Sequence, residues 1–171
     1  PIILLFLLGL VSGLLGDLFL ALRPLLPKDQ NGMIINRGII AFSIGHVFYF
    51  SALVILGEFR ILSVIVSIAM TVIIVIGSDV MKFEMGKNRI PAYLYSALIF
   101  LMVGQALSLV MSHGFKDAYG LIFVGALLFG LSDLILAPIY FKNMATKPMI
   151  ALNLLTYYAA QLLIALSVFY L

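Results

Sequence analysis

Hydrophobic positions along the chain fall into six long runs, separated by short segments that hold most of the charged residues. Each run has about 20 residues, the length that an α-helix needs to cross roughly 30 Å of hydrocarbon. The strands of a membrane β-barrel would instead give segments of about 10 residues with alternating polarity. The pattern predicts an all-α polytopic transmembrane bundle, a single domain over residues 1–171 with helices at about 2–22, 37–56, 61–81, 91–112, 118–141 and 148–171.

The composition agrees with a protein that resides in a membrane. Hydrophobic residues make up 64% of the chain and charged residues 10%, whereas a soluble domain has about 45–50% and about 25%. The net charge of +3 is too small to indicate nucleic-acid binding. The chain has no cysteine, so disulfides and thiolate chemistry are excluded.

Lysine and arginine are distributed unequally among the predicted loops, and cytoplasmic loops normally carry the excess. The first, third and fifth loops hold Arg23, Lys28, Arg37, Lys82, Lys87, Arg89, Lys142 and Lys147, and the other two hold Arg60 and Lys116. We therefore expect the odd-numbered loops to be cytoplasmic and both ends of the chain to face outward. Because Pro1 opens directly into an apolar run, there is room for one or more further N-terminal helices.

Two acidic residues lie inside apolar runs and share a local pattern. Asp17 is followed by Leu-Phe-Leu-Ala and Asp133 by Leu-Ile-Leu-Ala, and a small residue precedes each acid. An ionisable side chain within hydrocarbon costs roughly 2.5–3.5 kcal/mol on insertion scales, which makes it a candidate for function. The alternative is a structural hydrogen bond that holds two helices together.

Further polar residues are expected at a similar depth, counted from the cytoplasmic loops at about 1.5 Å per residue. Regular spacing places several of them on common helix faces, and facing lipid they would have no hydrogen-bond partner. We expect them to line a polar cavity toward the cytoplasmic side, and they are His46, Tyr49, Asp79, Tyr95, Asn153, Tyr157 and Gln161. Alternatively, His46 is a core residue, Asp79 reaches water at a helix end, and the tyrosines form an interfacial belt.

Several familiar catalytic sites do not fit these residues. A catalytic zinc usually has three protein ligands rich in His or Cys, and the apolar runs offer only His46. No Gly-x-Ser-x-Gly elbow supports a serine nucleophile. We expect neither a metal nor another cofactor, and the chemistry that remains is general acid and base catalysis by Asp17 and Asp133.

Four segments together resemble the successive signatures of the YhhN-like lysoplasmalogenase family. They surround Asp17, His46, Asp133 and Tyr157, and the run that begins at Tyr95 resembles a fifth. Their order and spacing agree over nearly the whole chain. Two features depart from the family pattern: Gly13 stands where a serine is expected, and members usually carry a further N-terminal helix.

The resemblance implies hydrolysis of the vinyl ether bond of a lysoplasmalogen to a fatty aldehyde and a glycerophospho-base. One buried carboxyl would protonate the β-carbon, and a second, ionised carboxylate would stabilise the oxocarbenium ion and activate water. The partners implied are a lysophospholipid-type substrate and the surrounding lipids. A bacterial cytoplasmic membrane is the expected location, or an internal membrane in a eukaryote.

Two other functions remain open on the sequence alone. Buried acids together with a histidine also suit a proton-coupled carrier of small solutes, although such carriers usually bind their substrate at mid-membrane on discontinuous helices. A non-catalytic membrane scaffold would tolerate Asp17→Asn and Asp133→Asn without loss of function.

Overall fold

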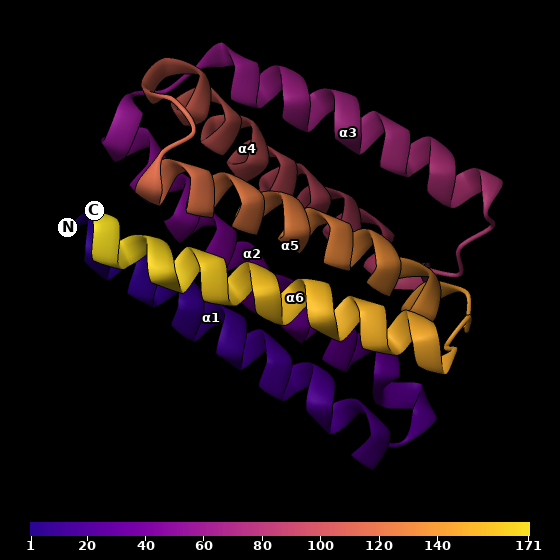
Figure 1. Ribbon diagram of the computed structural model, residues 1–171. Coiled ribbons are helices and arrows are strands. Elements are labelled where there is room, and N and C mark those ends of the chain that lie inside the picture. Colours follow the sequence, from indigo (N-terminus) through magenta and orange to yellow (C-terminus); the bar gives the residue numbers. More distant parts are fainter.

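The computed structural model describes the backbone of all 171 residues and every side chain except those of Lys28 and Asp117. Over this described chain it has six α-helices and no strand: α1 (Ile2–Leu22), α2 (Asn31–Gly57), α3 (Ile61–Val80), α4 (Arg89–His113), α5 (Asp117–Phe141) and α6 (Lys147–Ser167). The helices run side by side as one elongated bundle (Figure 1). All six are long and apolar enough to cross a membrane, which confirms the predicted polytopic helical bundle.

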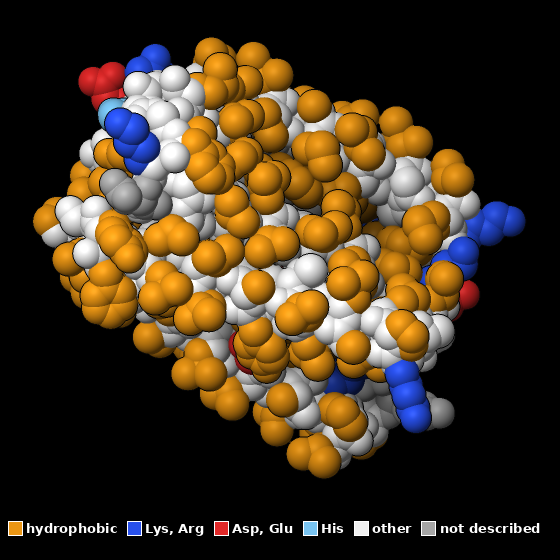
Figure 2. Space-filling view, in the orientation of Figure 1, with side chains coloured by type: hydrophobic (Ala, Val, Ile, Leu, Met, Phe, Trp, Pro, Cys, Tyr) orange, Lys and Arg blue, Asp and Glu red, His pale blue; other side chains and the backbone are white. Residues whose placement is uncertain are grey.

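The outer surface of the bundle suits contact with lipid. Hydrophobic side chains cover its flank, while charged side chains gather at the two ends (Figure 2). Large apolar residues such as Leu14, Ile68 and Leu155 are exposed on three different helices. An apolar exterior of this extent would be unusual for a soluble monomer, so the chain is an integral membrane protein.

Most helix ends lie within two residues of the predicted positions, but α2 begins at Asn31 rather than at residue 37. The polar residues of this segment were predicted to form a loop. In the structure Ile34 and Ile35 are buried, and Ile35 packs with Met85 and Phe141. Tertiary packing therefore extends the helix beyond the apolar run. At the other end of the chain, α6 stops at Ser167 and a 3-10 turn follows.

Glycines allow α1 and α2 to pack closely. A methyl group at Gly9 would collide with the Tyr49 ring, and one at Gly16 would lie 2.6 Å from Cε2 of Phe42. Gly45 on α2 faces the backbone carbonyl of Gly9. Small residues at such positions let helix backbones approach each other, and here they bring α1 against the aromatic core.

Helix α3 lies at the edge of the bundle and packs chiefly against α4. Its only buried side chains are the serines Ser63, Ser67 and Ser78. The Ser67 hydroxyl donates a hydrogen bond of 2.7 Å to the carbonyl oxygen of Ala97. The Ser63 hydroxyl bonds most closely to the carbonyl oxygen of Arg60 and also lies 3.0 Å from Oε1 of Gln105. Polar contacts therefore join this helix pair in addition to the apolar packing of Met70 and Ile74.

Candidate functional site

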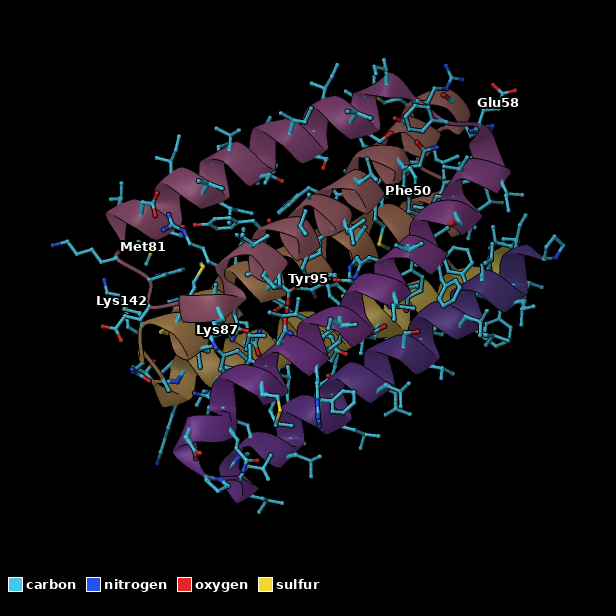
Figure 3. All side chains as sticks on the ribbon, turned by 180° about the vertical axis from the view of Figure 1, so that it is seen from behind. Phe50, Glu58, Met81, Lys87, Tyr95 and Lys142 are labelled. Carbon is cyan, nitrogen blue, oxygen red and sulfur yellow. The ribbon has the colours of Figure 1, made fainter. Side chains whose placement is uncertain are left out.

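A pocket of about 380 Å³ lies inside the bundle, within the size range of small-molecule sites. It is nearer the end where Lys87 and Lys142 lie, opposite Glu58 (Figure 3). All six helices contribute to it, and most of its wall is apolar. The polar lining residues are Asp17, Tyr93, Tyr95, Ser96, Ser132, Asp133, Tyr140, Asn153, Tyr157 and Tyr158.

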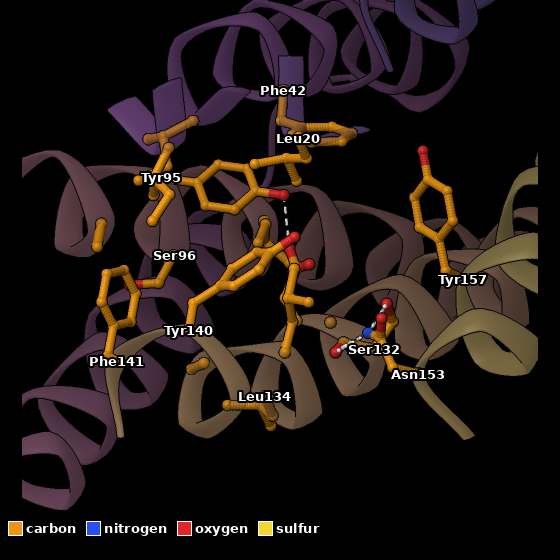
Figure 4. A pocket seen from close by; sticks show the side chains of 18 of the residues that line it. Leu20, Phe42, Tyr95, Ser96, Ser132, Leu134, Tyr140, Phe141, Asn153 and Tyr157 are labelled. Carbon is orange, nitrogen blue, oxygen red and sulfur yellow. Dashed lines mark hydrogen bonds between the residues drawn. The ribbon is translucent and has the colours of Figure 1, made fainter. Parts of the chain in front are cut away.

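One carboxylate of the pocket comes from α5. The hydroxyl of Tyr95, on α4, donates a hydrogen bond of 2.5 Å to Oδ2 of Asp133 (Figure 4). Gly130, about one turn before the acid, lies close to the Phe100 ring of α4, so α4 and α5 approach each other near this bond. Among the described residues, Oδ1 of Asp133 has no hydrogen-bond donor. This oxygen is therefore open to a group that enters the pocket.

The second carboxylate comes from α1 and ends a chain of hydrogen bonds. The Tyr49 hydroxyl donates to Oε1 of Gln161 over 3.2 Å, and Nε2 of Gln161 donates to the Tyr157 hydroxyl over 3.0 Å. The Tyr157 hydroxyl in turn donates to Oδ2 of Asp17 over 2.7 Å. Three side chains thus fix the position of one carboxylate, and such networks make the geometry of a site rigid.

Gly13 provides the space for this chain. A methyl group at Gly13 would lie 2.8 Å from Nε2 of Gln161 and 3.8 Å from the Tyr157 hydroxyl oxygen. The departure from the family pattern at this position therefore has a physical consequence. The glycine admits the amide that holds Tyr157 against Asp17.

Asn153 is fixed on the pocket wall next to Asp133. Its Nδ2 atom donates to the carbonyl oxygen of Ser132 over 2.8 Å and to the Ser132 hydroxyl over 3.1 Å (Figure 4). Both residues are buried. These contacts join α6 to α5 at the position of the acid and use the donors of the amide group.

His46 and Tyr49 do not line the pocket. The His46 ring packs against Phe129 and Tyr95, with ring centroids 4.6 Å and 5.5 Å away. Its Nδ1 atom lies 2.9 Å from the carbonyl oxygen of Phe42, which assigns the hydrogen to Nδ1. Its Nε2 atom has no partner among the described residues. His46 thus stands behind Tyr95, and Tyr49 reaches Asp17 only through Gln161 and Tyr157.

Asp79 lies outside the pocket. It is near the end of α3, exposed, and forms an ion pair of 2.5 Å with Arg89. Of the residues singled out from the sequence, the structure gathers Asp17, Tyr95, Asp133, Asn153 and Tyr157 around one cavity and keeps Gln161 in direct contact with this group.

Tyr140 was not expected in the pocket, because it lies close to the end of its helix. It follows Asp133 by seven residues, a spacing that places two side chains on the same face of a helix two turns apart. Tyr95 and Tyr140 both point toward the centre of the pocket in Figure 4. The spacing from Asp133 was the one available signal. Tyr93 shared with Tyr95 a place in the first turns of α4, whereas Ser96 and Tyr158 carried no signal.

The described side chains contain no group of three or more His, Asp or Glu residues that could bind a metal ion. The groups of the pocket that can transfer protons are its acids and hydroxyls. Two carboxylates, each with one oxygen bound by a tyrosine, can exchange protons with a molecule held between them.

Comparison with known proteins identifies the family of the chain. No curated protein and no solved structure matches the chain. The family model described as the YhhN family matches residues 2–168, which is essentially the whole chain. The chain therefore belongs to the YhhN family, the family of the lysoplasmalogenases.

Proposed function

We propose that the protein is an intramembrane hydrolase that cleaves the vinyl ether bond of lysoplasmalogens, releasing a fatty aldehyde and a glycerophospho-base. The observation that carries the proposal is that Asp17 and Asp133, from helices distant in sequence, line the same pocket. Each is held by a tyrosine hydroxyl. Membership of the YhhN family supports the same reaction class.

The reaction divides naturally between two carboxyl groups. One of them, protonated, gives its proton to the β-carbon of the vinyl ether, and the double-bond electrons form the new C–H bond. The resulting oxocarbenium ion is stabilised by the other, ionised carboxylate. That carboxylate takes a proton from water as the water oxygen attacks the α-carbon. The hemiacetal then collapses to an aldehyde and the glycerol hydroxyl, so one water is consumed.

The walls of the pocket suit a lipid substrate. Leu134, Leu154 and Tyr158 line the cavity and are also exposed on the outer surface of α5 and α6. An acyl chain can therefore lie against lipid-facing residues while the polar end of the molecule meets the acids. Mostly apolar walls with a few convergent polar groups are typical of small-molecule sites.

The position of the pocket favours hydrolysis over transport. Its lining residues come from the half of the bundle next to residues 23–30, 81–88 and 142–146. In the other half, Nε2 of Gln105 hydrogen-bonds to the Glu58 carbonyl, and Leu109 packs against Gly57. A carrier usually binds its substrate near the middle of the membrane on discontinuous helices, whereas the lining residues of this pocket lie toward one end of the bundle. We place the opening of the pocket on the cytoplasmic side, in line with the distribution of lysine and arginine.

The test is to incubate the purified protein with a lysoplasmalogen and, separately, with the acyl ester analogue, and to follow aldehyde release from the first and fatty-acid release from the second. We expect aldehyde from the vinyl ether and no fatty acid from the ester, and a loss of aldehyde release of about 100-fold or more in Asp17→Asn and in Asp133→Asn. Asp79→Asn is the matched control, because Asp79 lies outside the pocket, and it should retain wild-type activity. Absence of aldehyde at every pH tested would remove the proposal.

A further inference from the structure

A cation lies at the edge of the pocket, held over an aromatic ring that lines it. Arg23 begins the 3-10 turn that follows α1, and its Cζ atom is 4.6 Å from the centre of the Tyr140 ring. Tyr140 belongs to the pocket wall. A guanidinium group at this distance is attracted by the face of the ring, so the charge is kept beside the pocket.

The Arg23 guanidinium is not engaged by a protein anion. Among the described side chains the one ion pair joins Arg89 to Asp79, so Arg23 forms none. It is half-buried, whereas Arg89 is exposed. The planar fork of five N–H donors is suited to bind a phosphate through two parallel hydrogen bonds. The N–H groups of Arg23 thus have no anionic partner among the described side chains, and they lie beside the wall of the pocket that holds the two acids.

The distance along the helices from the two acids to Arg23 and Tyr140 is comparable with the distance from the reacting carbon of a lysolipid to its phosphorus. Asp17 and Arg23 are six residues apart and Asp133 and Tyr140 are seven apart, which correspond to about 9 Å and about 10 Å of helix. In a lysoplasmalogen six bonds separate the α-carbon of the vinyl ether from phosphorus, or about 7 Å at about 1.2 Å per extended bond. The arginine side chain can span the remainder.

We propose that Arg23 binds the phosphate of the lysolipid at the mouth of the pocket and selects phosphorylated vinyl ethers over neutral ones. This inference rests on the proposed function and adds to it a residue that determines the substrate class. The ionised carboxylate of the pair, in a mostly apolar pocket, would repel the phosphate of the substrate, because charges interact strongly where water is excluded. A guanidinium held by Tyr140 offsets that repulsion at the position of the phosphate.

The kinetic test uses protein reconstituted in phosphatidylcholine vesicles and two vinyl ethers, a lysoplasmalogen and the 1-alkenylglycerol that lacks phosphate. Arg23→Gln should raise KM for the phosphorylated substrate at least tenfold and change that for the alkenylglycerol less than twofold. Arg23→Lys should fall between wild type and Arg23→Gln, because it keeps the charge but loses the fork. Arg37→Gln removes an exposed arginine outside the pocket and should match wild type with both substrates.

A binding measurement separates this inference from the proposed reaction. The saturated 1-alkyl ether lysophospholipid has the phosphate but no double bond, so its Kd reports recognition without hydrolysis. We expect Arg23→Gln to weaken its binding at least tenfold and to leave binding of 1-alkylglycerol unchanged. Equal effects on the two ethers, or none on either, would overturn the inference. If binding depends on Arg23 but no aldehyde forms, the reaction is wrong and the phosphate site stands.

Discussion

The Tyr157 hydroxyl, on α6, donates a hydrogen bond of 2.7 Å to the carboxylate of Asp17, on α1. Few other contacts join these two helices, because α1 packs mainly on α2 and α6 mainly on α5. The bond therefore connects two helix pairs across the pocket. It sets the position of Asp17 relative to α6, the helix that also carries Asn153.

Removing that hydroxyl should impair catalysis more than folding. A hydrogen bond to a charged group contributes about 1.5–3 kcal/mol, so we expect Tyr157→Phe to lower kcat/KM for aldehyde release by roughly 10- to 100-fold. The ring keeps its packing against Phe42 and Phe129, so the thermal midpoint should fall only by the contribution of the hydrogen bond, about 3–12 °C. Tyr170→Phe, at an exposed position outside the pocket, is the control. Wild-type activity in Tyr157→Phe would contradict a role for this bond.

The close contact between α1 and α2 can be tested by substituting Gly9, with Gly77 of α3 as the control position. Gly9→Ala forces a methyl group against the Tyr49 ring, and overpacking of this kind typically costs about 1–3 kcal/mol. Gly77→Ala, within α3, meets nothing within 4 Å and should be neutral or stabilise by up to about 1 kcal/mol through helix propensity. Thermal or denaturant unfolding in the same detergent compares them. Similar stability of the two variants would refute this account of the helix contact.

His46 is expected to act through packing. His46→Ala removes a fully buried ring between Phe129 and Tyr95, and large-to-small changes in a core cost about 2–5 kcal/mol. His46→Leu refills most of this space and should recover stability and aldehyde release together. A stable His46→Leu variant that is nevertheless inactive would instead assign the imidazole a part in the chemistry.

The orientation in the membrane can be measured directly because the chain has no cysteine. Single cysteines introduced as Lys87→Cys and Lys116→Cys lie on opposite sides in the predicted topology. In intact cells, an impermeant maleimide should label Lys116→Cys and should label Lys87→Cys only after lysis. The reverse pattern would move the opening of the pocket to the outer side of the membrane.

The sequence predicted the six spans well because length and apolarity alone define a helix that crosses lipid. It missed the first six residues of α2, 31–36, because the burial of Ile35 depends on Met85 and Phe141, two residues distant along the chain. Tertiary contacts of this kind leave no local pattern.

The sequence predicts how deep a residue lies in the membrane better than it predicts the direction in which the side chain points. This difference explains which of the predicted site residues reach the pocket. Counting from the loops gives the depth of Asp79 but not the side of α3 on which it lies, and the structure turns it outward to Arg89. Regular spacing was more informative, because Asn153, Tyr157 and Gln161 do follow one face of α6 toward the pocket. The contact between Arg23 and Tyr140 joins the ends of two helices and is not encoded in either segment alone.

The serine face of α3 has a consequence for biogenesis. The Ser67 hydroxyl donates to the carbonyl oxygen of Ala97, and Ser63 lies within hydrogen-bond distance of Gln105 as well as of Arg60. Ala97 and Gln105 leave the ribosome only after α3 has been synthesised. Until then these hydroxyls can donate hydrogen bonds only to acceptors in or next to their own helix or to the translocon. We therefore expect α3 and α4 to enter the bilayer together as a hairpin, so that a nascent chain halted between them stays bound to the translocon.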